Sequence, residues 1–346
     1  MRTQGSRRRS GALSRTIVFI LVIVGAALAY AIFWRRAPGT LIVYCAHDAV
    51  YSESVLNDFQ RATGMPVAPK FDTEATKSLG LVEQIIRERT SPRCDVFWNN
   101  EILGTMRLRS EGLLQPYQGP GYERIPPRFR DPDGYWAGFG ARLRVYIINT
   151  DLMQPTEEAV SKTLAGDLSH VAIARPLYGT TLTQYCVMYD ALGLDGLKAW
   201  HDDMRARGIR EVTGNAQVKN LVGEGVCTLG FTDSDDYFGA KDDGLPVAAL
   251  PVRTPDGATI CIPNTVSIVK GCAQPEAARR LADYLLSAEV ELRLAQSRAR
   301  QIPLGPVDQT QLPDEVKQLA GWAEDGVPLT DLLPARRACE EWLKNE

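Results

Sequence analysis

The chain has 346 residues, of which 45% are apolar and 23% charged, and its formal net charge is −3. This length predicts two domains, since single cores stop growing near ~250–300 residues, and the composition excludes a disordered chain, a collagen and a small disulfide scaffold. All seven charged residues before residue 40 are arginines, so the remaining 32 basic groups face 42 acidic ones, an acidic balance that argues against nucleic-acid binding.

The first element along the chain is an apolar run flanked by arginines. Ile17–Trp34 holds 18 apolar or aromatic residues without interruption, and a helix of that length spans ~27 Å, close to the ~30 Å of a bilayer core. Five arginines precede it and two follow, which predicts a basic cytoplasmic segment over 1–16, a transmembrane anchor over 17–34 and an exported body. The alternative is a signal peptide cleaved near Ala27-Leu28-Ala29, which leaves the body soluble in the periplasm.

The body begins with alternating strands and helices. Leu41–Cys45 is a short apolar run of the kind found in buried parallel strands. Apolar residues then repeat at helical spacing from Tyr51 to Ala62, and Gly64 supplies the stop. A second helix is predicted over 77–89, a strand over 94–98 and a further helix over 102–112. This succession indicates a parallel sheet with helices on its faces, an α/β fold.

The pattern continues after a loop rich in Pro, Gly and Asp over 119–138. Strands are predicted at 143–148, 171–174, 228–231, 248–251 and 265–269, and helices at 182–192, 197–208, 216–225, 275–288, 313–319 and 332–343. The seven cysteines are nowhere closer than eleven residues in sequence, so there is neither a CxxC pair nor zinc-ribbon spacing. We interpret them as buried small hydrophobes, and their spacing selects no disulfide.

Polar residues follow three of the predicted strands. His47-Asp48 comes after the first, Asn99-Asn100-Glu101 after another, and residues 232–237 (Thr-Asp-Ser-Asp-Asp-Tyr) after a third. Each turn alone is what helix capping produces. Open α/β sheets bind ligands at the carboxyl ends of their strands, however, so three such turns favour a shared pocket.

Other polar residues are interpreted as structural. His170 and His201 are predicted on the surface, and Asp131-Pro132-Asp133-Gly134 as a solvated turn. Arg142 and Arg144 are predicted to form structural ion pairs. The chain has no Gly-x-Ser-x-Gly elbow and no phosphate-binding loop, so no enzyme is expected, and a carboxylate-pair hydrolase built on Asp235 and Glu101 is the alternative kept open.

Several motifs resemble the bacterial extracellular solute-binding proteins of ABC importers, and among them the ferric-iron-binding group with the type II periplasmic binding fold. The resemblance covers roughly residues 40–305. It rests on Ile42-Val43-Tyr44, Phe59-x-x-x-Thr63-Gly64-x-x-Val67, Asp95-Val96-Phe97 with Asn99-Asn100-Glu101, Glu111–Leu114, Ala141–Thr150, Gly214-Asn215 and Glu276–Ser287.

The resemblance implies an α/β fold of two lobes with a cleft between them, in addition to the N-terminal transmembrane helix. Lobe 1 would comprise 40–141 and 265–346, and lobe 2 would comprise 142–264, with crossings near 140–148 and 262–268. The cleft would close around a ligand by hinge motion. The expected partners are an ABC permease with its ATPase, and the expected form is a monomer on the periplasmic side of the bacterial inner membrane.

The resemblance also implies where a ligand sits. Iron-binding members use a histidine or acid after the first strand, a glutamate after the Asp-Val-Phe strand and adjacent tyrosines in the second lobe; here the tyrosine pair is missing. Ferric iron, with or without carbonate or phosphate, prefers hard oxygen ligands, and the tentative metal ligands are Asp48, Glu101 and Asp235. The full predicted ligand set is His47, Asp48, Glu74, Asn100, Glu101, Thr180, Thr181, Asn215, Asp233, Ser234, Asp235 and Tyr237.

Two other functions stay open at this point. The same carboxylates suit an ammonium group, through charge-assisted hydrogen bonds, so the first is binding of a small cationic or zwitterionic organic solute of the amine or phosphonate type. The second is ligand sensing without coupling to transport. No catalytic cofactor is expected in any of these.

Overall fold

The computed structural model describes residues 39–72 and 79–344, so the predicted segments 1–16 and 17–34 and the predicted ligand Glu74 lie outside the described residues. Within those ranges, every helix is too short or too polar to cross a membrane. The chain divides into two units after Thr40, and the unit that begins at Leu41 contains every element discussed below.

The first half of the sheet is built from parallel strands at the start of the chain. β1 (Leu41–Cys45) lies between β2 (Val67–Phe71) and β3 (Val96–Asn99), parallel to both. β10 (Cys261–Val269) is antiparallel to β3 and also pairs with the short β4 (Leu114–Gln115). Leu41, Val43 and Cys45 are fully buried, because helices cover both faces of this half-sheet.

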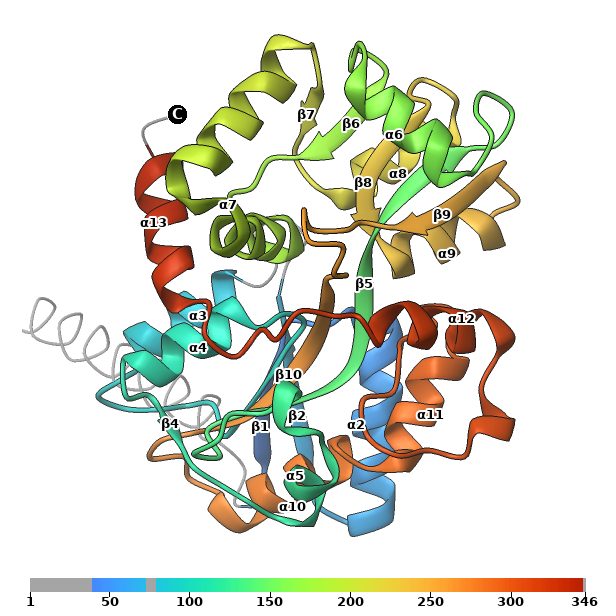
Figure 1. Ribbon diagram of the computed structural model, residues 1–346. Coiled ribbons are helices and arrows are strands. Elements are labelled where there is room, and N and C mark those ends of the chain that lie inside the picture. Colours follow the sequence, from blue (N-terminus) through green and yellow to red (C-terminus); the bar gives the residue numbers. More distant parts are fainter. Residues whose placement is uncertain (1–38, 73–78, 345–346) are drawn as a thin grey trace, which may run out of the picture. The chain divides into compact units, whose positions relative to one another are not determined.

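Helices surround these strands on the outside (Figure 1). In α2 (Ala49–Thr63), Val55, Leu56 and Phe59 form the buried stripe, and Gly64 ends the helix with φ of 68°. The predicted helix over 275–288 is two helices, because Ser287 interrupts it and caps the second by accepting a hydrogen bond from Val290 N. The other elements are α3 (Leu79–Arg87), α4 (Leu103–Ser110), α5 (Pro120–Arg124), η2 (Pro127–Phe129), α10 (Pro275–Leu285), α11 (Ala288–Gln296), η3 (Gln309–Gln311) and α12 (Asp314–Ala323).

The second half of the sheet contains β8 (Leu229–Asp233), β6 (Val171–Ala174), β7 (Arg210–Val212) and β9 (Val247–Pro251). The two helices predicted at 182–192 and 197–208 are confirmed: they share the label α7 (Gly179–Ala206), but non-helical backbone at Gly193, where φ is 70°, separates them. The remaining helices of this half are α6 (Glu157–Ala165), α8 (Asn215–Gly223) and α9 (Ser234–Asp242).

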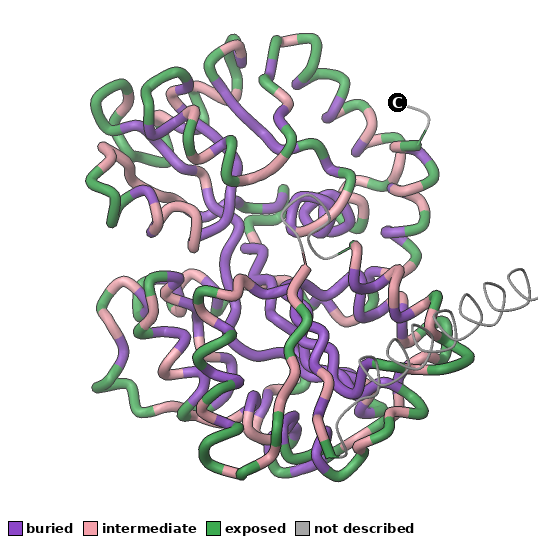
Figure 2. Tube along the Cα trace, turned by 180° about the vertical axis from the view of Figure 1, so that it is seen from behind, coloured by how far each residue is buried: buried purple, intermediate pink, exposed green. Residues whose placement is uncertain are grey.

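β5 (Ala137–Asn149) joins the two halves. It pairs with β10 through residues 137–143 and with β8 and β9 through residues 144–149. One hydrophobic core lies around Trp98, Phe139 and Leu281, and another around Tyr185 and Phe231. Figure 2 shows that the buried positions follow the strands, whereas the exposed ones lie on the outer helices and loops.

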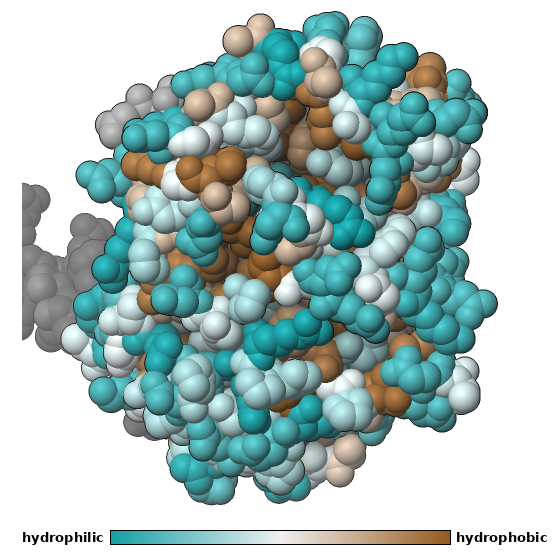
Figure 3. Space-filling view, in the orientation of Figure 1, coloured by the Kyte–Doolittle hydropathy of each residue, from teal (hydrophilic) through white to brown (hydrophobic). Residues whose placement is uncertain are grey.

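The lobe boundaries at 141/142 and 264/265 stay a prediction, supported by the change of strand partner within β5. The final helix, α13 (Leu333–Leu343), belongs by sequence to the predicted lobe 1. It packs against α7 of the predicted lobe 2 and also contacts α4 of lobe 1. The surface seen in Figure 3 is mainly hydrophilic, and apolar residues gather in its hollows.

Candidate functional site

A cavity of about 730 Å³ opens where strand ends meet the starts of three helices. Asp48 follows β1, Asn100 follows β3, and Arg142 projects from β5. The opposite wall comes from the first residues of α7, α8 and α9. The carboxyl ends of parallel strands thus supply the site, as the polar turns predicted. The lining residues from the prediction are Asp48, Asn100, Glu101, Thr180, Thr181, Asn215, Asp233 and Asp235.

Asp233 is the centre of a buried hydrogen-bond network in this wall. Its carboxylate accepts hydrogen bonds from Arg144 Nη1 at 2.7 Å, Thr180 Oγ1 at 2.6 Å and Asn215 Nδ2 at 2.9 Å. Thr181 Oγ1 donates to the Asn215 side-chain oxygen at 3.2 Å. The predicted ion pair of Arg144 is confirmed. Because the Asp233 carboxylate is bonded to Thr180 at the start of α7 and to Asn215 at the start of α8, Asp233 serves mainly to fix these two helix starts.

Arg142 lies across the cavity and connects its two walls. Its Nη1 donates to Asp235 Oδ2 at 3.1 Å, and its Nη2 donates to the backbone oxygen of Asn100. Burial raises the pKa of Asp235 despite the opposing effect of Arg142, and the charges of Asp233 and Asp48 raise it further. Arg142 is 6% exposed, so its guanidinium is a cation built into the site as well as the structural group that the sequence predicted.

Three carboxylates gather at the start of α9. Oxygen atoms of Asp233, Asp235 and Asp236 all lie within 4.8 Å of one another. Burial, followed by the charges of Asp235 and Asp233, raises the pKa of Asp236 to about 7, although Thr232 Oγ1 donates to this carboxylate at 2.8 Å. Like charges held this close retain a proton or attract a cation, and carboxylate oxygens suit a hard metal ion.

Glu101 caps the start of α4 as well as lining the cavity. It is 3% exposed, and its carboxylate accepts hydrogen bonds from Leu103 N at 2.5 Å, Gly104 N at 2.8 Å and Asn99 Nδ2 at 3.0 Å. These bonds satisfy the first backbone N–H groups of α4. The side chain of Asp48, by contrast, makes no capping hydrogen bond to α2 among the described residues.

Other predicted ligand residues lie outside the cavity lining. His47 is buried with its ring 5.3 Å from that of Trp98, and its Nε2 lies 2.8 Å from Gln301 Nε2. Ser234 accepts a hydrogen bond from Leu143 N at 3.2 Å, and the Tyr237 ring packs against Phe238 at 4.9 Å. These three positions help to build the joint, by which we mean the region where β5 and β10 cross between the two halves of the sheet.

The joint is tight around Gly140 in β5. Its φ is 48°, and an added Cβ would lie 2.8 Å from Gln301 Oε1 and 2.9 Å from Leu294 Cδ1. Asn264 Nδ2 donates to the Gly140 carbonyl and, at 2.9 Å, to Gln301 Oε1. The strand crossings are therefore connected through Gln301 to His47, directly beside Asp48.

Two interpretations from the sequence are wrong. His201 is 3% exposed, and its Nδ1 lies 2.8 Å from the Tyr185 hydroxyl. Asp131 is 1% exposed and pairs with Arg109 at 2.6 Å. Both are buried because distant segments cover them, which local sequence does not reveal. His170 is exposed, as predicted.

Sequence reasoning also missed residues that line the cavity, chiefly Arg175, Tyr178, Gln217 and Asp236. Asp236 carried a signal, since it belongs to the same acidic turn as Asp233 and Asp235. Arg175 follows the strand predicted at 171–174 directly, so the strand-end rule would have found it.

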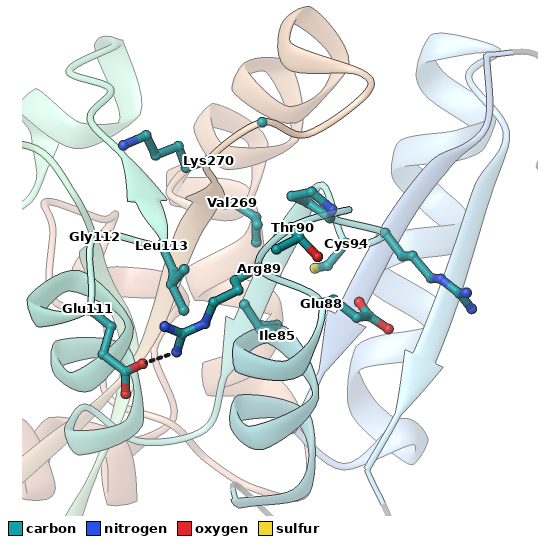
Figure 4. A pocket seen from close by; sticks show the side chains of 13 residues that line it. Ile85, Glu88, Arg89, Thr90, Cys94, Glu111, Gly112, Leu113, Val269 and Lys270 are labelled. Atoms are coloured by element: carbon teal, nitrogen blue, oxygen red, sulfur yellow. Dashed lines mark hydrogen bonds and ion pairs between the residues drawn. The ribbon is translucent and has the colours of Figure 1, made fainter.

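A second cavity of about 440 Å³ lies at the opposite edge of the first half-sheet (Figure 4). Cys94, before β3, and Lys270, after β10, line it together with Leu113. Arg89 Nη2 and Glu111 Oε2 pair across its rim at 2.6 Å. None of the described residues that the sequence predicted as ligands lines this cavity, so it is not the candidate site.

Comparison with known proteins identifies relatives of most of the body. The model of the family described as bacterial extracellular solute-binding protein matches residues 41–297. Iron uptake protein A1 of Synechocystis sp. is 27% identical over 236 residues, which cover 63% of this chain and 64% of that protein. The chain therefore spans slightly less than two thirds of this relative.

Solved structures share the fold. Iron-bound HitA from Pseudomonas aeruginosa superposes with a TM-score of 0.76 at 22% identity, over 88% of this chain and 99% of that one. The periplasmic binding protein AfuA from Actinobacillus pleuropneumoniae, with fructose-6-phosphate bound, gives 0.63 at 20% identity, over 84% and 99%. The α/β fold of periplasmic binding proteins is thereby confirmed.

Proposed function

Because the chain belongs to the bacterial extracellular solute-binding proteins, we propose that it is the receptor of an ABC importer and captures ferric iron in its cleft. The observation that carries the proposal is the carboxylate cluster of Asp233, Asp235 and Asp236, within 4.8 Å, beside Asp48 on the cavity wall. Iron uptake protein A1 and iron-bound HitA support iron as the cargo. Binding without turnover is the expected activity.

The geometry refines the set of proposed iron ligands. Asp48 and Asp235 stay in the set, and Asp236 joins them because it lines the same cavity. Glu101 leaves the set, since its carboxylate already holds the start of α4. Asp233 contributes negative charge to the iron site without binding the metal itself, because its oxygens remain bonded to Arg144, Thr180 and Asn215.

The cavity also offers partners for an anion that accompanies the iron. Arg142 and Arg175 supply positive charge, and the starts of α7 and α8 present backbone N–H groups. Carbonate or phosphate bound there would neutralise part of the charge of Fe³⁺ and fill coordination positions that carboxylates leave open. We therefore expect iron to bind more tightly with such an anion than without it.

A titration of the full chain with a soluble ferric chelate tests the proposal, with and without carbonate or phosphate. Asp235→Asn should weaken iron binding by at least ~10-fold, equivalent to ~1.4 kcal/mol. Asp314→Asn is the matched control, because Asp314 is an exposed carboxylate on α12 outside the cavity. If both variants bind iron like the wild type, the carboxylate cluster is not the iron site.

A small zwitterionic solute of the phosphonate or amine type is the second candidate. The observation in its favour is that Arg142 and Arg175 line the same cavity as the acids, so both charges of such a molecule find partners. A thermal-shift panel with phosphonates, amines and sugar phosphates separates the two candidates. A shift with an organic solute and none with iron would replace the first candidate by the second.

The anchor and the partners belong to the same proposal. We expect residues 17–34 to hold the receptor at the periplasmic side of the inner membrane, as a monomer that delivers its cargo to a permease and its ATPase. Membrane fractionation tests the anchor: the chain should pellet with membranes, whereas cleavage of the segment would release it. Ligand sensing without transport predicts normal binding but no uptake by cells that contain the permease.

A further inference from the structure

The last segment of the chain extends from one half of the body to the other. Gly326 bridges to Thr259, and Val327 N donates to the Thr259 carbonyl at 3.0 Å. The chain then continues to α13, which packs against α7 and contacts α4 (Figure 1). Leu329, Leu332 and Ala335 along this segment are at most 1% exposed. We call residues 326–343 the C-terminal strap.

Aromatic rings fix how the strap lies on α7. The rings of Tyr185 and Trp342 stack with centroids 6.3 Å apart, and Trp342 meets the His201 ring edge-on at 5.3 Å. A cysteine on each helix lies close to these rings. Cys186 directly follows Tyr185, and Cys339 lies three residues before Trp342. Both cysteines are fully buried and belong to the same hydrophobic core cluster.

The other cysteines have different neighbours. Cys45 Sγ donates to the His47 carbonyl at 3.7 Å, and Cys94 Sγ to the Val96 carbonyl at 3.1 Å. Cys272 accepts from Gln115 Nε2 at 3.7 Å. Cys186 and Cys339 differ from these cysteines because they lie on two packed helices, α7 and α13, whose neighbouring rings Tyr185 and Trp342 stack on each other.

We propose that Cys186 and Cys339 are an oxidation site, at which export converts the two thiols into a disulfide that fastens the strap to α7. The proposal rests on export of the chain and is independent of the ligand. Oxidising compartments outside the cytoplasm allow disulfides to form and persist.

The oxidant is a small or protein-borne disulfide. One cysteine thiolate attacks it and forms a mixed disulfide while one thiol leaves; the second cysteine then attacks the mixed disulfide and releases the other. Two protein thiols lose two electrons and two protons, and the oxidant becomes two thiols. Both cysteines are fully buried in the folded protein, so this exchange takes place before the strap has packed completely.

The crosslink would close a loop of about 150 residues. Such a loop restricts the unfolded chain strongly, so the oxidised protein is expected to melt about 5–10 °C above the reduced one. The disulfide would also keep α13 on α7 when the cleft opens and closes, since α13 contacts elements of both halves.

The test uses the full chain exported into an oxidising bacterial periplasm. Free thiols are blocked by alkylation under denaturing, non-reducing conditions, and the peptides are mapped by mass spectrometry. The expected result is one crosslinked pair that contains Cys186 and Cys339, with the other five cysteines alkylated. Complete alkylation of Cys186 and Cys339, or a crosslink of either to another cysteine, overturns the proposal.

Melting curves with and without a reductant provide the second measurement. Reductant should lower the melting temperature of the wild type by about 5–10 °C and leave Cys186→Ala/Cys339→Ala unchanged. Cys261→Ala is the matched control, a buried cysteine on β10 that should keep the full response to reductant. An equal response in the double variant and the wild type contradicts the assignment, and no outcome depends on whether iron binds.

Discussion

Arg142 and Asp235 form an ion pair at 3.1 Å that joins the crossing strand β5 to the first turn of α9 inside the cavity. The same guanidinium donates to the backbone of Asn100, which follows β3. One side chain therefore contacts both walls of the cleft. It also offers a fixed positive charge among acids, so the site suits a cation that arrives with an anion better than a bare cation.

The first prediction concerns Arg142. Arg142→Met removes the guanidinium and keeps an apolar stem, so the gain in iron affinity on adding phosphate or carbonate should fall by about 10-fold, ~1.4 kcal/mol. Calorimetric titration with a ferric chelate, in the presence and absence of the anion, measures this gain. Arg87→Met, an exposed arginine at the end of α3, is the control. An undiminished anion effect in Arg142→Met would show that the anion binds elsewhere.

The second prediction is a pH dependence of iron binding. The pKa of Asp236 is raised to about 7 by burial and by Asp235 and Asp233, and that of Asp235 is raised as well. A metal ion must displace these protons, so affinity should fall by about 10-fold for each pH unit below 7 if one proton is released. Affinities measured from pH 5 to 8 check this. A flat profile would mean that neither carboxylate binds the metal.

The raised pKa of Asp236 predicts the opposite pH trend for the stability of the ligand-free protein. Its folded pKa near 7 exceeds the ordinary value of about 3.9, so between these values the folded state binds more protons than the unfolded state. Stability should therefore decrease as pH rises from about 4 to 7, by a few kcal/mol at most, and stay low above. Asp236→Asn should flatten this part of a melting-temperature profile, whereas an unchanged slope would assign it to another group.

The third prediction separates structure from binding at Glu101. Glu101→Gln loses the charge that holds the first N–H groups of α4, and about 1–3 kcal/mol of unfolding free energy should be lost. Iron affinity should stay within about twofold of the wild type, because the carboxylate already has its partners. Denaturant unfolding and iron titration give the two numbers. A large loss of affinity with unchanged stability would restore Glu101 as a ligand.

The sequence predicted much of the sheet, because buried parallel strands are short apolar runs. β1 was located at its observed bounds, Leu41–Cys45. Asp48, Asn100, Thr180, Asn215 and Asp235 meet at one cavity because the carboxyl ends of parallel strands share an edge. That convergence is a property of topology, and it does not depend on the exact course of any loop.

The roles within the site could not be predicted in the same way. Glu101 and Asn100 are adjacent, yet the turn directs the Glu101 carboxylate into α4 and leaves the Asn100 carbonyl to Arg142. His201 looked exposed on a charged helix, but Trp342 from the end of the chain covers it. Turn geometry and contacts between distant segments decide such roles, and neither is encoded in local periodicity.

The last prediction concerns ion pairs between α9 and the turn after α11. Arg300 donates to both oxygens of Asp242, at 2.8 and 2.9 Å, and Arg298 donates to the Gly239 carbonyl at 3.2 Å and to Asp243. These bonds join the two halves beside a smaller cavity of about 210 Å³, which Arg298 lines together with Asp48 and Asp235 of the candidate site. They are partly exposed, so each contributes only about 0–1 kcal/mol, but all of them must break when the two halves move apart.

Asp242→Asn should therefore shift the ligand-free protein toward more open forms without unfolding it. We expect a larger radius of gyration in small-angle X-ray scattering and a two- to fivefold weaker iron affinity, equivalent to about 0.4–1 kcal/mol. Arg279→Gln removes an exposed pair with Glu276 on α10 and should change neither quantity. High salt should reproduce the effect of Asp242→Asn in the wild type, because screening weakens exposed pairs. If the radius of gyration is the same for Asp242→Asn and the wild type at low salt, these pairs do not hold the cleft closed.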